Sequence, residues 1–252
     1  MSEVIHGNCL EVLPKLGKFD FIFADPPFNI GRDYDNYSDN IFDYENWCRE
    51  WIELCWLHLK PNGILCLHGN DNLAEIFLCN ARRLNFAAHR IEWILWHYRF
   101  GQCTRTRFID AKCHCLVYAK DTPYTWNPDA VLVPSDRAEV YGDTRVNDTE
   151  RGGQRLPGTV WGVPSDGGCW GRVQGNNGER RPLHNNQLPE NYLKRLILAY
   201  TDEGDTVLDP FGGSGTTITV AHHLSRVGTT IELSNLYCQS IVNRVKEGMV
   251  RL

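Results

Sequence analysis

Residues 205–217 read DTVLDPFGGSGTT, a short apolar strand pattern followed by a glycine-rich turn and by the start of a helix pattern. Glycine permits positive φ and lets a ligand approach the main chain, and the N-terminus of the following helix offers unpaired N–H groups. The next strand pattern, residues 227–232, ends in Glu232, where a carboxylate can accept hydrogen bonds from both hydroxyls of a ribose. Neither a G-x-G-x-x-G dinucleotide motif nor a G-x-x-x-x-G-K-S/T phosphate loop is present. We therefore predict a nucleoside site, with little reason to expect NAD or ATP.

The rest of the chain continues this alternation of strand and helix patterns, which predicts an α/β domain with a mainly parallel sheet. Strands are predicted at residues 19–24, 64–67, 90–97 and 115–119. Helices are predicted at residues 42–59, 72–84 and 188–200. The segment 121–182 is rich in Gly, Pro, Asn, Asp and Arg and has no sustained periodicity, so we interpret it as an irregular insertion. Its tryptophans favour a binding surface over a flexible linker.

Length and composition narrow the class of protein. With 252 residues, 42% of them hydrophobic and 23% charged, the chain is expected to form one domain around this insertion. No run of about eighteen apolar residues would span a membrane, and the N-terminus lacks the features of a signal peptide. The ten cysteines lie mostly in apolar runs, where free cysteine behaves as a small hydrophobe. A cytoplasmic protein is the expectation.

The tetrad Asp25-Pro26-Pro27-Phe28 directly follows the first apolar strand, at a position where α/β proteins bind ligands. Two prolines stiffen the turn and provide no N–H partner for its carbonyl groups. The Asp25 carboxylate and the Pro26 carbonyl could then converge as acceptors on an exocyclic amino group, while Phe28 stacks on the base that carries it. Taken alone, Asp-Pro-Pro is also compatible with a simple strand terminator.

Charge is unevenly distributed along the chain. The formal net charge is −5, yet residues 82–120 carry eight basic and two acidic side chains, interleaved with aromatic residues. Taken alone, this basic strip is interpreted as an ordinary solvated face. Cys103, Cys113, His114 and Cys115 lie in the same strip, but Cys-x-Cys without a second pair does not favour zinc, and no metal site is predicted.

Both acidic motifs resemble those of a known family. Residues 25–29 (DPPFN) and 208–217 (LDPFGGSGTT) are similar to the catalytic and cofactor motifs of the amino-group DNA methyltransferases, which make N6-methyladenine or N4-methylcytosine. The order of catalytic motif, insertion and cofactor motif resembles the β class, in which the insertion is the target-recognition region. Further matches lie at residues 6–10, 29–34, 59–63 and 229–232, with Tyr237 and Arg244. The sequence departs from the family at Asn8, Phe28 and Leu188, where Asp, Tyr and Lys are frequent.

The resemblance implies a Rossmann-like methyltransferase fold with permuted motif order, helices on both faces of the sheet, and S-adenosyl-L-methionine as cofactor. The implied reaction is methyl transfer to the N6 amino group of adenine at specific duplex DNA sites, after the base has flipped out of the helix. The implied catalytic residues are Asp25, Pro26, Pro27 and Phe28. The implied cofactor-binding residues are Asn8, Asp25, Asp209, Pro210, Phe211, Gly212, Gly213, Ser214, Gly215, Thr216, Thr217 and Glu232. The candidate DNA contacts are Arg99, Arg105, Arg107, Lys112, Arg151, Arg155, Arg172, Arg180 and Arg181.

Two alternative functions stay open at this point. Cytosine-N4 methylation uses the same chemistry, and only Asp rather than Ser before Pro-Pro favours adenine, by family resemblance. From another class, the chain could be a non-catalytic subunit that binds DNA or S-adenosylmethionine, although intact Asp25, Asp209 and Glu232 argue against it. Double-stranded DNA is the implied partner and no membrane is expected; a homodimer and a cognate restriction endonuclease, as in a restriction-modification system, stay open.

Overall fold

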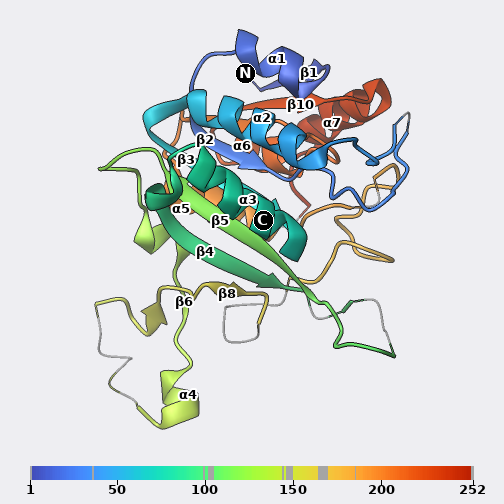
Figure 1. Ribbon diagram of the computed structural model, residues 1–252. Coiled ribbons are helices and arrows are strands. Elements are labelled where there is room, and N and C mark those ends of the chain that lie inside the picture. Colours follow the sequence, from blue (N-terminus) through green and yellow to red (C-terminus); the bar gives the residue numbers. More distant parts are fainter. Residues whose placement is uncertain are drawn as a thin grey trace.

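The computed structural model describes residues 2–35, 37–98, 100–101, 105–143, 145, 150–163, 170–184 and 186–250. In these residues, eight strands form one sheet with the order β1-β10-β9-β2-β3-β5-β4-β8 (Figure 1). The strands are β1 (Glu3–His6), β2 (Phe19–Ala24), β3 (Leu59–Gly69), β4 (Arg90–His97), β5 (Lys112–Ala119), β8 (Val160–Trp161), β9 (Thr206–Asp209) and β10 (Val227–Glu232). All neighbours from β1 to β3 are parallel, as are β4 and β8, whereas β5 is antiparallel to β3 and β4. The predicted mainly parallel sheet is confirmed.

Helices cover both faces of the sheet, as expected. They are α1 (Cys9–Val12), α2 (Tyr44–Leu57), α3 (Asp71–Arg83), α4 (Arg137–Tyr141), α5 (Glu190–Tyr200), α6 (Thr216–His223) and α7 (Asn235–Glu247), with short 3-10 helices at Leu13–Lys15, Ala87–His89 and Pro128–Val131. In Figure 1, α2 and α3 lie in front of the sheet, and α5 and α6 lie behind it. Among the described residues, no helix combines the length and apolar character needed to cross a membrane.

The strand β2 shows why the apolar runs are continuous rather than alternating. Phe21 and Phe23 pack in the core between the sheet and α5 and α6, whereas Ile22 and Ala24 pack in the core beneath α2 and α3. Because both faces of a central parallel strand are covered, the fully buried side chains from Phe21 to Ala24 are all apolar. The run therefore stops where the strand leaves the core, at Asp25.

Where the structure describes the segment 121–182, its helices and strands are short. Its strands β6 (Val133–Pro134) and β7 (Gln154–Arg155) pair with each other outside the main sheet, while β8 extends the main sheet beside β4. Figure 1 shows β6 and α4 below the body of the sheet. A target-recognition role for this segment stays a prediction.

Candidate functional site

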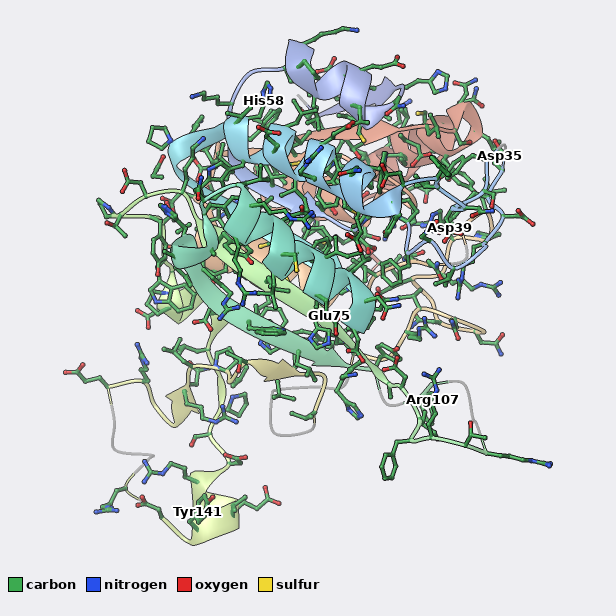
Figure 2. The ribbon with its side chains drawn as sticks, in the orientation of Figure 1. Asp35, Asp39, His58, Glu75, Arg107 and Tyr141 are labelled. Carbon is green, nitrogen blue, oxygen red and sulfur yellow. The ribbon has the colours of Figure 1, made fainter. Side chains whose placement is uncertain are left out.

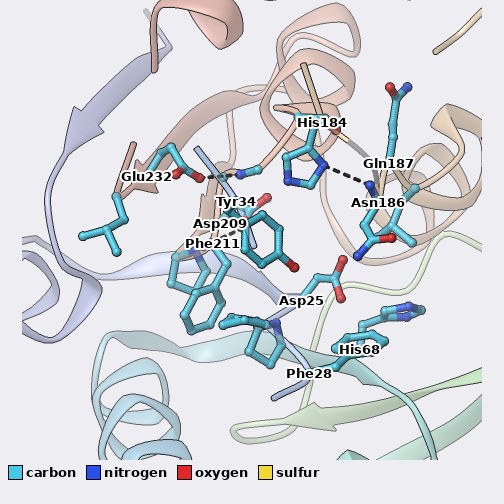
Figure 3. A pocket seen from close by; sticks show the side chains of 18 of the residues that line it. Asp25, Phe28, Tyr34, His68, His184, Asn186, Gln187, Asp209, Phe211 and Glu232 are labelled. Atoms are coloured by element: carbon cyan, nitrogen blue, oxygen red, sulfur yellow. Dashed lines mark hydrogen bonds between the residues drawn. The ribbon is translucent and has the colours of Figure 1, made fainter. Parts of the chain in front are cut away.

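Three acidic residues from three neighbouring strands meet at one edge of the sheet. Asp25 follows β2, Asp209 ends β9 and Glu232 ends β10. The strand β9 lies between β10 and β2. From this junction the sheet continues through β10 to β1 on one side and through β2 to β3 on the other. Such a reversal of strand order opens a crevice at the carboxyl ends of the strands. All three acids line one cavity of about 370 Å³ (Figure 3).

The cavity gathers most of the residues that the sequence predicts for cofactor binding and catalysis. The lining includes Asn8, Asp25, Pro26, Pro27, Phe28, Asp209, Pro210, Phe211, Gly212, Gly213, Ser214, Thr216, Thr217 and Glu232. Gly215 is not part of the lining; it is the N-cap of α6 with φ 76°, and a Cβ at this position would lie 2.8 Å from Ile241 Cγ2. Among the nine candidate DNA contacts, Arg172 lines the cavity and Arg99 lies outside the described residues.

The glycine turn is held against the acid that follows the next strand. The Gly213 N–H donates to Glu232 Oε2 at 2.7 Å, and the Ser234 N–H donates to Glu232 Oε1 at 2.8 Å. A Cβ at Gly212 would lie 2.7 Å from Thr230 Oγ1, so a larger residue there would push the turn off the sheet. Burial raises the pKa of Glu232, and these N–H donors oppose that rise. The carboxylate is thus fixed in orientation and keeps acceptor capacity toward the cavity.

The carboxylate of Asp25 has an oxygen atom that accepts no hydrogen bond from the described residues. This atom, Oδ1, is buried. Burial, together with the charge of Asp209, raises the pKa of Asp25 well above its usual value. The Pro27 carbonyl accepts from the Tyr44 hydroxyl, whereas the Pro26 carbonyl accepts no hydrogen bond from the described residues. A buried acceptor left unsatisfied costs folding energy, which a ligand donor would recover.

Asp209 is 4% exposed and accepts from the Phe211 N–H at 3.0 Å. Burial raises the pKa of Asp209 to about 7, although hydrogen bonds from Thr217 and Phe211 oppose the rise. Two buried acids beside each other make the cavity a site that attracts positive charge or N–H donors.

We expect an Asp209→Asn substitution to stabilise the ligand-free protein at neutral pH. Because the folded state raises the pKa of Asp209 from 3.8 to about 7, folding stability is lost as pH rises through this window and is constant above it. The difference in unfolding free energy between variant and wild type should grow by about 2 kcal/mol from pH 5 to pH 7.5. Thermal unfolding at both pH values measures it. An equal difference at both would show that Asp209 ionises normally.

The loop after the Asp-Pro-Pro-Phe tetrad is pinned by one buried acid. Asp39 is 1% exposed and accepts from the N–H groups of Ile30 and Arg32 at 3.1 and 2.6 Å. Asn29 has φ 54° and its side chain accepts from the Ile41 N–H at 2.7 Å. These contacts hold the described residues of this loop, 29–35 and 37–41, beside the cavity, and Tyr34, Tyr37 and Ile41 join its lining.

A buried ion pair braces the glycine turn from behind. Arg244 of α7 and Glu190 of α5 are 1% and 0% exposed, with Nη2 and Oε1 separated by 3.0 Å. Arg244 Nη1 donates to the Ser214 carbonyl at 2.9 Å and to Thr216 Oγ1 at 2.8 Å. The glycine turn is therefore held in place by Arg244, which does not itself line the cavity.

Three departures from the family motifs occupy defined positions. Asn8 lines the cavity and caps α1, since its Oδ1 accepts from the Leu10 N–H at 3.0 Å. The Leu188 carbonyl accepts from Thr216 Oγ1 at 3.3 Å. Phe28 packs against the cores on both faces of the sheet. Each position thus keeps a structural role with the residue that stands there.

Several lining residues escaped the sequence reasoning, among them His68, Trp96, Cys113 and His184. His68 ends a predicted apolar strand just as Asp25, Asp209 and Glu232 do, and a polar residue at that position was the available signal. The others reach the cavity from elements whose spatial order the sequence does not state. Burial lowers the pKa of His184 to about 4, so its ring is neutral.

The sheet divides the basic strip between two edges. Because β4 runs parallel to β3, the β4–β5 connection with Arg105 and Arg107 leaves the sheet at the same edge as the cavity. Figure 2 shows Arg107 on this connection, which projects from the body of the molecule. The Lys120 N–H donates to the Gly63 carbonyl at 2.9 Å, at the opposite edge, and Arg82 and Arg83 end α3 there.

The remaining candidate DNA contacts have mixed surroundings. Arg172 lies over the Tyr98 ring at 4.7 Å, and Arg180 lines a second hollow that shares Arg32 and Gln174 with the cavity. Four others pair with acids, namely Lys112 with Asp71 at 2.7 Å, Arg151 with Asp129 at 3.5 Å, Arg155 with Asp136 at 3.6 Å and Arg181 with Glu247 at 2.9 Å.

Comparisons with known proteins agree with this arrangement. A family model described as DNA methylase, of the N6/N4 methyltransferase type, matches residues 19–243. Type II methyltransferase M.HpaI from Haemophilus parainfluenzae is 32% identical over 250 residues, which are 97% of this chain and 74% of that protein. DNA adenine methyltransferase YhdJ from Escherichia coli (strain K12) is 34% identical over 264 residues, 100% of this chain and 82% of that protein.

Solved structures share the fold at lower identity. The M1.HpyAVI–SAM complex matches with a TM-score of 0.67 and 19% identity, over 97% of this chain and 99% of that chain. PvuII DNA methyltransferase (cytosine-N4-specific) matches with a TM-score of 0.71 and 17% identity, over 96% of this chain and 85% of that chain. The expected Rossmann-like architecture is thereby confirmed.

Proposed function

The chain belongs to the DNA methylase family of N6/N4 amino-group methyltransferases, and from this premise we propose that it methylates the N6 amino group of adenine in duplex DNA. The observation that carries the proposal is a pair of acceptors at the cavity, Asp25 Oδ1 and the Pro26 carbonyl, which accept no hydrogen bond from the described residues. An exocyclic amino group has two N–H donors, which match these two acceptors. A base that reaches them must first leave the DNA helix.

Asp25 and the Pro26 carbonyl would promote methyl transfer by positioning the target amino group. Asp25 and the Pro26 carbonyl accept the two amino protons, which directs the nitrogen lone pair away from both acceptors. The acceptors are fixed before the base arrives, and they stabilise the positive charge that develops on nitrogen. Phe28 replaces part of the stacking that the base loses on leaving the helix. No enzyme nucleophile is required, and no cysteine in the chain follows a proline.

The other end of the cavity fits S-adenosylmethionine. Glu232 is fixed by two N–H groups and can accept from ribose hydroxyls, and the Phe211–Gly215 turn lets main chain approach a ligand. Asp209, with Asp25 beside it, favours a bound cation, because both buried carboxylates gain a counter-charge. A cavity of about 370 Å³ is of the size that holds small cofactors. S-adenosylmethionine supplies a methyl group on positively charged sulfur.

Two observations favour adenine over cytosine as the target base. Asp rather than Ser precedes Pro-Pro in this chain, and the YhdJ relative, named for adenine, is 34% identical. Cytosine-N4 methylation is the second candidate, because Asp25 and Pro26 would bind either amino group. A homodimer and a cognate restriction endonuclease are proposals of the resemblance alone.

DNA would bind along the cavity edge, with Arg105, Arg107 and Arg172 as candidate phosphate or base contacts. We expect the double substitution Arg105→Ala/Arg107→Ala to weaken DNA binding at all sequences and to lower the slope of log K against log salt by about 2. Titrations at several salt concentrations measure the slope. The matched control, Arg82→Ala/Arg83→Ala, removes equal charge from the far edge of the sheet and should leave the slope unchanged. Equal slopes for both double variants would show that Arg105 and Arg107 do not contact DNA phosphates.

Incubation of duplex DNA with the purified protein and methyl-labelled S-adenosylmethionine tests the proposal. Label transferred to DNA supports catalysis. Binding of both ligands without transfer would instead identify a non-catalytic subunit.

A further inference from the structure

His68 is the second-last residue of β3, and it lines the cavity. Its neighbours hold the imidazole ring in place. Its Nδ1 lies 3.0 Å from the Tyr192 hydroxyl of α5. The rings of Phe23, Tyr192 and Trp96 surround it, with centroids at 5.9, 5.3 and 6.1 Å. The residue is 1% exposed, so the ring has little freedom to turn.

The second ring nitrogen is available to a ligand. Among the described residues, Nε2 of His68 has no hydrogen-bond partner, and it is not sealed off from the cavity that His68 lines. Burial lowers the pKa of His68 to about 3, so the ring is neutral at physiological pH. A neutral imidazole carries one proton, and the partner of Nδ1 decides which nitrogen bears it.

His68 lies at the end of the cavity away from the ribose acid. In Figure 3, Asp25 lies between Glu232 and His68, and Phe28 lies on the same side as His68. Of the aromatic rings that contact His68, those of Phe23 and Trp96 also line the cavity. Such surroundings suit a planar base more than the polar end of a cofactor.

We propose that His68 reads the edge of the flipped base: the Tyr192 hydroxyl donates to Nδ1, and the Nε2–H donates to the base ring nitrogen next to the amino group. This inference rests on the proposed function. Together with Asp25, His68 then presents an acceptor beside a donor. Adenine and cytosine offer the complementary pattern, an amino donor beside a ring-nitrogen acceptor. With the same edge turned toward the protein, guanine offers O6 beside N1–H and thymine offers O4 beside N3–H, so either base would face like groups at both positions.

The proposal predicts a specific coupling between His68 and one base atom. Once modified sites have been mapped, the target base is replaced by 1-deaza or 7-deaza adenine, or by 3-deaza cytosine if cytosine is the target. Wild type should lose about 100-fold in kcat/KM on one of these substrates. His68→Phe should lose a similar amount on normal DNA and nothing further on that substrate. Additive losses on every deaza substrate would overturn the proposal.

A matched control separates recognition from a general effect on folding. His114 is a second buried histidine, in β5, held by Asp71 and Trp93 and outside the cavity lining. His114→Phe should keep the wild-type ratio of rates on normal and deaza DNA, whatever it does to stability. A ratio that collapses in His114→Phe as it does in His68→Phe would contradict a direct contact.

The tautomer of His68 provides a test that needs neither DNA nor activity. Nitrogen NMR of the protein should show His68 protonated at Nε2 and unprotonated at Nδ1. Tyr192→Phe, which removes only the hydroxyl, should shift this tautomer equilibrium. A proton on Nδ1 in the wild type would overturn the proposal. A wild-type protein that transfers no methyl group to any DNA would instead refute the proposed function and leave the tautomer assignment intact.

Discussion

Asp25→Ala should reduce methyl transfer by about a thousandfold or more while leaving most of the affinity for S-adenosylmethionine. The substitution removes the buried Oδ1 acceptor, which has no hydrogen-bond partner among the described residues. The glycine turn and Glu232 keep their hydrogen bonds, because these do not involve Asp25. Single-turnover rates and calorimetric cofactor binding measure the two effects separately.

Two further variants sharpen this prediction. Asp25→Asn keeps the size of the side chain and one carbonyl acceptor, and should retain more activity than Asp25→Ala. Glu53→Ala removes one negative charge from the exposed face of α2 and should match the wild type in both assays. Undiminished transfer by Asp25→Ala would end its assignment as a catalytic residue.

Arg244→Met should lower the free energy of unfolding by about 3–5 kcal/mol, because it removes the guanidinium that forms a buried ion pair with Glu190. The same change removes the hydrogen bonds to the Ser214 carbonyl and to Thr216 Oγ1, so cofactor affinity should fall as well. Chemical denaturation measures the first effect and cofactor titration the second.

The double variant Arg244→Met/Glu190→Gln separates these two effects. It removes the buried negative charge with little change of shape, so much of the lost stability should return. Cofactor affinity should stay low, because the glycine turn still lacks its brace. If affinity returned together with stability, Arg244 would act on folding alone and not on the turn.

The fold and the cofactor end of the cavity were predictable because each signal is local in sequence. Asp25, Asp209 and Glu232 each end an apolar run, and the carboxyl ends of parallel strands meet at one edge of a sheet. The parallel sheet followed from strands that are apolar on both faces, as β2 shows. The short strand β1, with exposed residues at both ends, lacked such a run and was missed.

The parts that sequence did not predict depend on contacts between distant segments. Arg244 lies 54 residues from Glu190, and His68 lies 124 residues from Tyr192, so no spacing rule relates either pair. The basic strip was interpreted as one surface, but the reversal of direction between β4 and β5 sends Lys120 to the far edge and Arg107 to the cavity edge. The direction of each strand determines which edge a basic residue reaches, and sequence periodicity does not encode strand direction.

Mass spectrometry of nucleosides from methylated DNA tests the central claim most directly. DNA treated with the protein and S-adenosylmethionine, or isolated from a host that expresses it, is digested and its methylated nucleosides are resolved. The account predicts N6-methyladenine, and its loss in the Asp25→Ala variant. N4-methylcytosine without N6-methyladenine would overturn adenine as the target base, and the absence of both would contradict amino-group methylation of DNA altogether.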